Sequence, residues 1–172
     1  MKAEVLSIGS ELTSGQNLDT NSQWLSRRLA EAGIPVGWHT TIADDFDANL
    51  DAFRIATGRA QLVLVTGGLG PTQDDLTREV LAKLAGVELV FHEESFKTIQ
   101  EMFTKRGRQM PERNRVQALF PAGAEIIPNE RGTAPGVWMN LRGALVAAMP
   151  GVPSEMFVMF DKQVLPRLTG LG

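Results

Sequence analysis

A glycine-rich stretch is the first feature of this sequence whose residue types could do chemistry. Residues 66–77 read TGGLGPTQDDLT and directly follow an apolar run at residues 62–65. Glycines leave backbone N–H groups uncovered, and N–H groups that precede a helix bind anions. The groups expected to face a phosphate are Gly67, Gly68, Gly70 and Thr72. The stretch lacks the third glycine of a dinucleotide fingerprint and the Gly-Lys pair of a Walker A loop, so it predicts neither of those sites.

Two aspartates, Asp74 and Asp75, follow these glycines, and the stretch contains no Lys or Arg. Two carboxylates repel a phosphate unless a cation lies between them, and Mg²⁺ is commonly shared by carboxylate and phosphate oxygens. We therefore predict a metal-dependent diphosphate or nucleotide site with both aspartates as metal ligands. The alternative is purely structural: Asp75 caps the following helix, and the glycines only turn the chain.

A second polar loop, residues 9–21, follows the first apolar run and should open at the same edge of a parallel sheet. It is long for a connection of this kind, and long connections are commonly functional. Four side chains in it are candidates for binding a hydroxylated ligand or a cation: Ser10, Glu11, Asp19 and Asn21. Under the alternative interpretation Asn21 or Ser22 caps a helix and Asp19 faces solvent.

Asp44 and Asp45 end the second predicted strand and should project over this same edge. One of them is expected to cap the helix that follows, which leaves the other free. Asp44 is nearer the strand, so it is the predicted third metal ligand.

Three further segments are candidates for the same site. Residues 105–115, KRGRQMPERNR, contain five basic residues and one Glu, so an Arg from this segment, or Arg131, could neutralise a second phosphate. A solvated basic face is the alternative. The loops at residues 129–136 and 150–155 are rich in Gly and Pro, which either make plain turns or let the backbone approach a ligand closely. Their candidate residues are Gly132, Thr133, Pro150 and Gly151.

The composition excludes several classes of function. The 172 residues carry 17 Lys and Arg against 20 Asp and Glu, whereas a general nucleic-acid-binding protein needs a basic excess. The absence of Cys excludes a disulfide framework and a thiolate zinc site. Glu4 and Glu11 interrupt the apolar segment of a signal peptide, and no stretch has the ~20 apolar residues of a membrane span. We expect a cytoplasmic protein that binds neither nucleic acid nor membrane.

The spacing of apolar residues predicts the elements that hold these loops. Strands are expected at residues 3–8, 35–42 and 62–65, and the helices between and after them end at Gly33, Gly58 and Gly86. This alternation is typical of a parallel sheet covered on both faces. A helix at 93–106, a β-hairpin across Arg142 and Gly143, and a closing helix at 153–165 should follow. We predict one three-layer α/β/α domain over residues 1–168, mainly parallel with an antiparallel hairpin, and a tail at 169–172.

Five segments, in this order, resemble the amino-terminal domain of the competence/damage-inducible protein CinA family, which is in turn similar to the molybdopterin-binding fold. They are IGSELTSGQNLDTN, TGGLGPTQDDLT, ERNRVQALFP, NERGTAPG and MPGVPSEM. The sequence departs from the family at Thr13, where an apolar residue is more usual. Full-length CinA proteins carry a further carboxyl-terminal domain with nicotinamide-mononucleotide deamidase activity. No part of that domain is recognisable in these residues, so deamidation is not expected of them.

The resemblance implies metal-dependent hydrolysis of ADP-ribose to AMP and ribose 5-phosphate, with Mg²⁺, Mn²⁺ or Co²⁺ as the cofactor, in a homo-oligomer. By motif position it assigns Asp75 and Asp44 to the metal-dependent step, and Glu11 or Asp19 would orient the attacking water. One alternative is a pterin-binding or adenylyl-transferring protein of molybdenum-cofactor synthesis. Another is a non-catalytic nucleotide-binding module. The expected small-molecule partner is accordingly a nucleotide sugar or a pterin-like compound.

Overall fold

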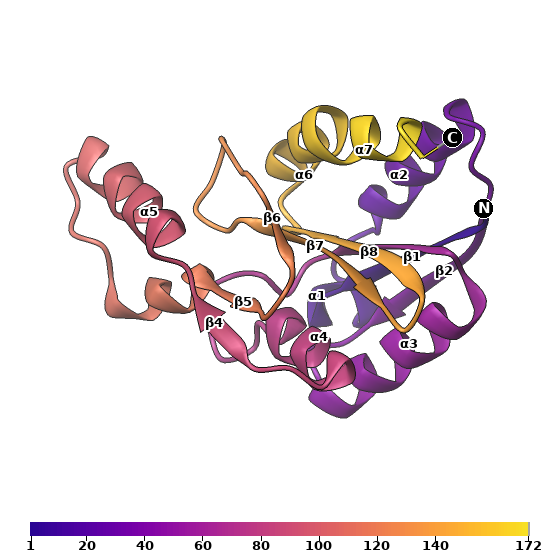
Figure 1. Cartoon of the computed structure of the whole chain (residues 1–172), viewed down its shortest axis with the longest axis horizontal. Helices are drawn as coiled ribbons and strands as arrows, with labels where there is room; N and C mark the ends of the chain where they lie inside the picture. The colour runs from indigo at the N-terminus through magenta and orange to yellow at the C-terminus, as the bar shows by residue number, and fades with distance from the viewer. Residues whose placement is uncertain (172) are drawn as a thin grey trace.

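The computed structural model describes residues 1–171, and a six-stranded sheet forms its centre (Figure 1). The strand order is β2-β1-β3-β8-β7-β6. The strands are β1 (Ala3–Ile8), β2 (Val36–Ile42), β3 (Leu62–Thr66), β6 (Glu125–Ile127), β7 (Gly136–Leu141) and β8 (Ala144–Met149). The first three and β8 run parallel, whereas β7 is antiparallel to both of its neighbours. The predicted mainly parallel sheet with an antiparallel hairpin is confirmed.

Helices cover both faces of this sheet and complete the predicted three layers (Figure 1). One face carries α3 (Phe46–Arg59) and α4 (Thr77–Ala85), and the other carries α2 (Thr20–Glu31) and α6 (Pro153–Met159). The chain continues from α6 through a π-helical turn, η2 (Phe160–Val164), into α7 (Leu165–Thr169). Every residue of β1 and of β3 is buried, as expected for strands covered on both faces.

Several predicted helix boundaries were wrong. Gly58 does not end α3, which continues to Arg59, because one glycine in a helix costs only about 1 kcal/mol relative to alanine. Asp19, and not Asn21 or Ser22, caps α2. Its carboxylate accepts a hydrogen bond from the Ser22 N–H. The predicted loop at residues 9–21 contains a short helix, α1 (Ser10–Thr13).

The closing helix is longer than predicted and widens in the middle. It was expected to end at residue 165, but α7 continues to Thr169. The π-helical turn ends at Val164, two residues before Pro166. A proline has no N–H to donate and crowds the carbonyl four residues earlier, so the helix continues through Pro166 only with altered hydrogen bonding before it.

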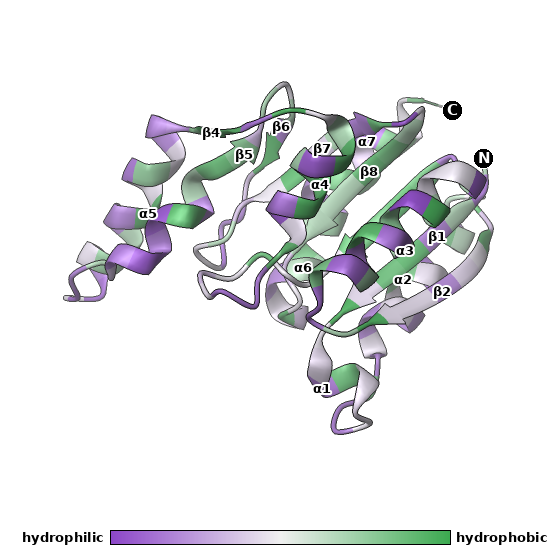
Figure 2. Cartoon of the chain, turned by 90° about the horizontal axis from the view of Figure 1, so that it is seen from below, coloured by the Kyte–Doolittle hydropathy of each residue, from purple (hydrophilic) through white to green (hydrophobic). Residues whose placement is uncertain are grey.

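An arm, residues 92–118, extends from the sheet on a small two-stranded ribbon. The ribbon pairs β4 (Leu89–Phe91) with β5 (Leu119–Pro121), and the arm consists of α5 (Glu93–Lys105), a connecting loop and the 3-10 helix η1 (Glu112–Ala118). Figure 2 shows hydrophobic residues concentrated on the strands, whereas hydrophilic residues predominate on α5. Within residues 1–171, no helix has both the length and the apolar character needed to cross a bilayer.

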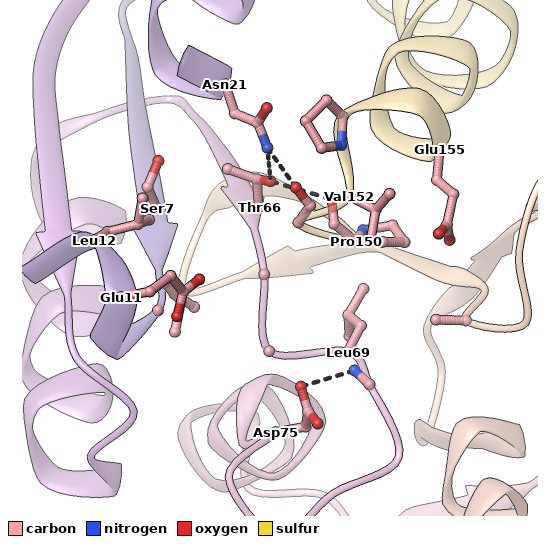
Figure 3. Close-up of a pocket in the computed structure, with 18 of the residues that line it drawn as sticks. Ser7, Glu11, Leu12, Asn21, Thr66, Leu69, Asp75, Pro150, Val152 and Glu155 are labelled. Atoms are coloured by element: carbon pink, nitrogen blue, oxygen red, sulfur yellow. Dashed lines mark hydrogen bonds between the residues drawn. The ribbon is translucent and has the colours of Figure 1, made fainter. Parts of the chain in front are cut away.

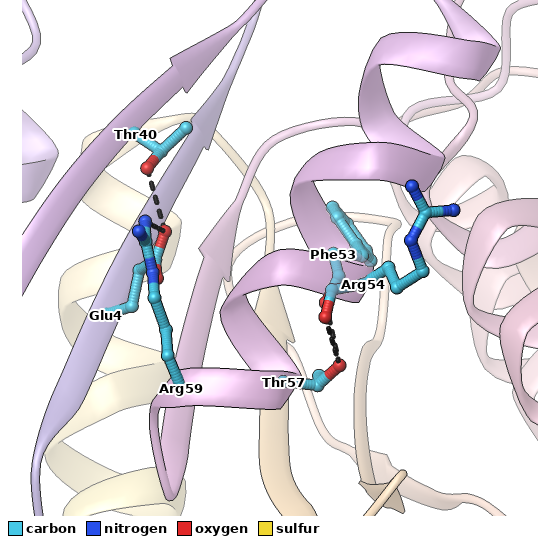
Figure 4. A network of polar contacts seen from close by, with 6 residues as sticks. All are labelled: Glu4, Thr40, Phe53, Arg54, Thr57 and Arg59. Carbon is cyan, nitrogen blue, oxygen red and sulfur yellow. Dashed lines mark hydrogen bonds and ion pairs between the residues drawn. The ribbon is translucent and has the colours of Figure 1, made fainter.

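A buried ion pair ties the first strand to the end of α3 (Figure 4). Glu4 is 1% exposed and accepts two hydrogen bonds from the Arg59 guanidinium, at 2.7 and 3.0 Å, and one from the Thr40 hydroxyl at 2.7 Å. The hydrogen bond to Glu4 raises the pKa of Arg59 above its usual value. The Arg59 guanidinium also lies over the ring of Trp38, 4.4 Å from its centre. The buried carboxylate is therefore neutralised and fully hydrogen-bonded.

Replacement of Arg59 by methionine should lower the free energy of unfolding by about 3 kcal/mol, because the Glu4 carboxylate then stays buried without its cation. This is the low end for a buried pair, since the Arg59 side chain is 36% exposed. Urea denaturation measures the loss. Arg54→Met on the same helix is the matched control, because the Arg54–Asp51 pair is exposed and should be worth less than about 1 kcal/mol. Equal losses in the two variants would contradict the prediction.

Candidate functional site

A cavity of about 860 Å³ opens at the carboxyl ends of β1 and β3. The strand order reverses between these two strands, since β2 lies on one side of β1 and β3 on the other. Such a switch point is where open α/β sheets bind ligands, and the volume suits a small organic ligand. Most of the predicted site residues line it (Figure 3): Glu11, Asp19, Asn21, Asp44, Gly67, Gly68, Gly70, Asp75, Thr133, Pro150 and Gly151.

The glycine loop after β3 is shaped by close contacts within the protein. Gly67 and Gly68 have φ values of 111° and 74°, and a Cβ atom on Gly67 would overlap the carbonyl oxygen of Ile8. The Gly67 N–H donates to the Met149 carbonyl, and the Gly70 N–H donates to Asp75, both at 2.9 Å. Within residues 1–171 only the Gly68 N–H of the three has no acceptor. The predicted cradle of three glycine amides is therefore reduced to one.

Asp75 fixes the shape of this loop and does not cap α4. Its carboxylate accepts hydrogen bonds from the Gly70 N–H at 2.9 Å, the Thr72 N–H at 3.0 Å and the Thr72 hydroxyl at 2.7 Å. The residue at the cap position of α4 is Leu76, which makes no side-chain capping bond. Thr72 is thus a partner of Asp75 and does not line the cavity.

Arg78 holds the same loop through its carbonyl oxygens and was not found by sequence analysis. The side chain is 4% exposed and donates to the carbonyl oxygens of Leu69 and Gly70. Burial lowers the pKa of Arg78 to about 10, although the nearby carboxylate of Asp75 acts in the opposite direction. The sequence offers no signal for this role, because an Arg in the first turn of a helix is normally solvent-exposed.

Asp44 and Ser10 join the loops that follow β1 and β2. The Ser10 N–H donates to the Asp44 carboxylate, and the Asp44 N–H donates to the Ser10 hydroxyl, both at 3.1 Å. Asp45 caps α3 by accepting from the Ala48 N–H at 2.9 Å. The prediction that one of these two aspartates caps the helix is confirmed, whereas Asp44 lines the cavity and is held by Ser10 instead of being free. Ser10 itself supports Asp44 and does not line the cavity.

Asn21 connects three segments at the floor of the cavity (Figure 3). Its side-chain amide donates to the Thr66 hydroxyl and to the Gly151 carbonyl, both at 2.9 Å, and it does not cap α2. Its own side-chain oxygen is buried and has no partner within residues 1–171. Asp19 lines the cavity, but its carboxylate is used by Ser22 and by the Ser7 hydroxyl, at 3.0 Å for the latter.

Glu155 is a site residue that sequence analysis missed. It lies on α6 and faces the cavity (Figure 3), and one carboxylate oxygen accepts from the Asn129 side chain at 2.8 Å. Gly132 leaves room for that carboxylate, because a Cβ atom there would overlap it. Gly132 therefore leaves space for Glu155 and is not itself part of the lining. The only available signal was an acidic residue within the loop already selected at residues 150–155.

The lining of the cavity is acidic. Five carboxylates contribute to it, namely Glu11, Asp19, Asp44, Asp75 and Glu155, and among the described residues no Lys, Arg or His does. The cations predicted to meet a second phosphate, from residues 106–115 or from Arg131, are therefore not in the lining. At its rim, Leu18 and Val152 are 85% and 51% exposed.

The predicted metal site of Asp44, Asp74 and Asp75 is not assembled. Asp74 is exposed and lies outside the lining. Over residues 1–171, no three carboxylate, imidazole or thiol groups converge as metal ligands. Neighbouring aspartates in a turning loop point in different directions, and Asp75 is already held by three donors. Metal dependence stays a prediction.

Comparisons with known proteins agree on the fold and on the family. The family model described as "Probable molybdopterin binding domain" matches residues 4–170. A CinA-like protein of Dictyoglomus thermophilum is 50% identical over 168 residues, which are 98% of this chain and 41% of the relative. The crystal structure of CinA from Thermoplasma acidophilum has a TM-score of 0.87 and 33% identity, covering 98% of this chain and 97% of that one. The molybdopterin biosynthesis enzyme MoaB of Thermus thermophilus, 20% identical over 99% of this chain and 94% of its own, shares the fold with a TM-score of 0.64.

Replacement of Gly67 by alanine should lower the free energy of unfolding by about 3 kcal/mol, because backbone strain adds to overlap with a carbonyl that cannot move. Gly86→Ala is the matched control, since Gly86 also has a positive φ, 68°, but a Cβ atom there meets nothing within 4 Å. It should lose only about 1 to 2 kcal/mol from strain. Urea denaturation compares the two, and the same loss in both would mean that the contact with Ile8 is unimportant.

Proposed function

This chain belongs to the molybdopterin-binding-domain family and, within it, to the CinA-like proteins, and from this premise we propose that its cavity binds a pterin-type small molecule. The observation that carries the proposal is the acidic lining, which contains carboxylates, amides and hydroxyls but no cation among the described residues. Such a lining favours a ligand that offers hydrogen-bond donors. A pterin ring offers an amino group and a ring N–H side by side, and the two oxygens of a carboxylate can accept both.

Glu155 is the best placed carboxylate for this ring edge. Asn129 donates to one of its oxygens at 2.8 Å and so fixes the direction of the carboxylate. That oxygen keeps a second lone pair and the other oxygen has no partner within residues 1–171, so both can still accept from a ligand. An acceptor that is already oriented costs little entropy when the ligand binds. Glu11 lies across the cavity from Glu155 (Figure 3) and makes no side-chain hydrogen bond within residues 1–171, so it would meet donors at the opposite end of the ligand.

Replacement of Glu155 by glutamine should weaken pterin binding about 10- to 100-fold, because a hydrogen bond to a charged acceptor is worth about 1.5–3 kcal/mol. The measurement is a titration that follows the fluorescence of an uncharged 6-substituted pterin, because the acidic lining would repel a phosphate group. Glu130→Gln is the matched control, since Glu130 is exposed and pairs with Lys162 away from the cavity. Unchanged affinity in Glu155→Gln, or an equal loss in both variants, would exclude this role of Glu155.

A second candidate is metal-dependent hydrolysis of a nucleotide diphosphate such as ADP-ribose. The same acidic lining supports it, because a diphosphate can enter only together with counter-ions. Asp44 uses one carboxylate oxygen for the Ser10 N–H, and its other oxygen is available to a hydrated cation. A bound divalent cation would neutralise phosphate charge and acidify a water molecule.

In this second candidate, the wild-type chain should release AMP and ribose 5-phosphate from ADP-ribose when Mg²⁺, Mn²⁺ or Co²⁺ is added. Asp44→Asn should lower that rate about 10- to 100-fold, the usual cost of losing a group that binds a hydrated metal ion. Product chromatography gives the rates. Asp45→Asn is the control, because asparagine still caps a helix. Absence of turnover with all three metals, at ligand concentrations that saturate binding, would leave only the pterin-binding proposal.

A further inference from the structure

The tip of the arm carries cations that no carboxylate of the same chain neutralises. These residues are Lys105, Arg106 and Arg108, and all three are exposed. Within residues 1–171 none of them takes part in an ion pair. Arg115, nearer the base of the arm, is different: its guanidinium lies over the rings of Phe91 and Phe96, 4.3 and 5.4 Å from their centres. The base of the arm is therefore held by packing, whereas the cations at its tip form no ion pair within residues 1–171.

The arm holds these cations away from the cavity of its own chain. Gln117, at the base of the arm, lines the cavity. The thirteen residues of α5 place the tip about 20 Å from that base, at 1.5 Å per residue. The element that α5 mainly packs against is η1. The helix α5 itself projects from the body of the molecule (Figures 1 and 2). Because a helix is rigid, the tip cannot turn back to this cavity without breaking α5 or its base.

The charges of the tip complement those of the cavity. We propose that the arm of one copy of this chain places its arginines at the acidic cavity of a second copy. The proposed partner is a second copy because a single chain carries both the acidic cavity and the cations that form no ion pair. In a two-fold dimer each arm would meet the cavity of the other copy, which gives two equivalent contacts. Arginine suits the position, since its guanidinium binds carboxylates and phosphates through paired hydrogen bonds.

This contact would complete the site. In the complex, the partner's guanidinium groups supply the positive charge that the lining lacks, and a phosphate on the ligand is then held between the two copies. That consequence rests on the proposed function. The association itself does not, because it depends only on charges of the protein.

Sedimentation velocity at 50 and 500 mM salt, without ligand, tests the association. The wild-type chain should self-associate at low salt and dissociate at high salt. Two single-surface variants should each weaken self-association at least about tenfold: an arm variant with Lys105→Glu, Arg106→Glu and Arg108→Glu, and a cavity variant with Glu11→Lys. Mixing these two variants should restore association through one contact, because the unchanged arm of the cavity variant meets the unchanged acidic cavity of the arm variant. Lys162→Glu, elsewhere on the surface, is the control and should not change the association.

Three outcomes would overturn the inference: a monomeric wild-type chain at all concentrations, self-association that survives reversal of the arm, or no recovery on mixing. Binding of a short oligonucleotide by the wild-type chain but not by the arm variant, without any self-association, would assign the basic tip to nucleic acid instead. If the triple variant does not fold by near-UV circular dichroism, Arg108→Glu alone replaces it. Dimers that form but do not bind pterin would contradict only the proposed function.

Discussion

The ends of β1 and β3 meet through their backbones, because no side chain separates Gly67 from the carbonyl of Ile8. A third segment joins at the same point, since Gly151, after β8, lies against the backbone of Gly67. The loops that follow three parallel strands therefore begin from one place. This contact brings the Glu11, Asp75 and Pro150 regions around a single cavity, and a larger residue at position 67 would separate them.

Most polar groups around the cavity are already bound to other parts of the protein. Asp75 accepts hydrogen bonds from the glycine loop and Arg78 donates to it. Asn21 connects α2 to β3 and to the loop before α6, and Asn129 orients Glu155. A site built this way has little freedom to adapt, so its selectivity comes from positions fixed before the ligand arrives. A ligand, or a neighbouring copy, has to compensate the negative charge of the excess carboxylates.

Sequence reasoning found the elements whose signals are local. The buried strands read as continuous apolar runs, Gly86 ends its helix in the left-handed conformation, and Arg142 and Gly143 make the tight turn between β7 and β8. It found the region of the site for the same reason, since the loops after parallel strands share an edge. It could not find the roles of Asn21 or Glu155, whose partners lie 45, 130 and 26 positions away. Nor could it show that Asp74 and Asp75, adjacent in sequence, face different surroundings.

The exposed Leu18 side chain at the rim has a thermodynamic consequence for any flat ring that enters the cavity. Water orders around a leucine that is 85% exposed, and a ring that covers it releases this hydration. Burial of apolar surface makes the heat capacity of binding negative. The enthalpy of association would then become more favourable on warming while the entropy becomes less so. The affinity of this cavity would thus change much less with temperature than the heat released on binding.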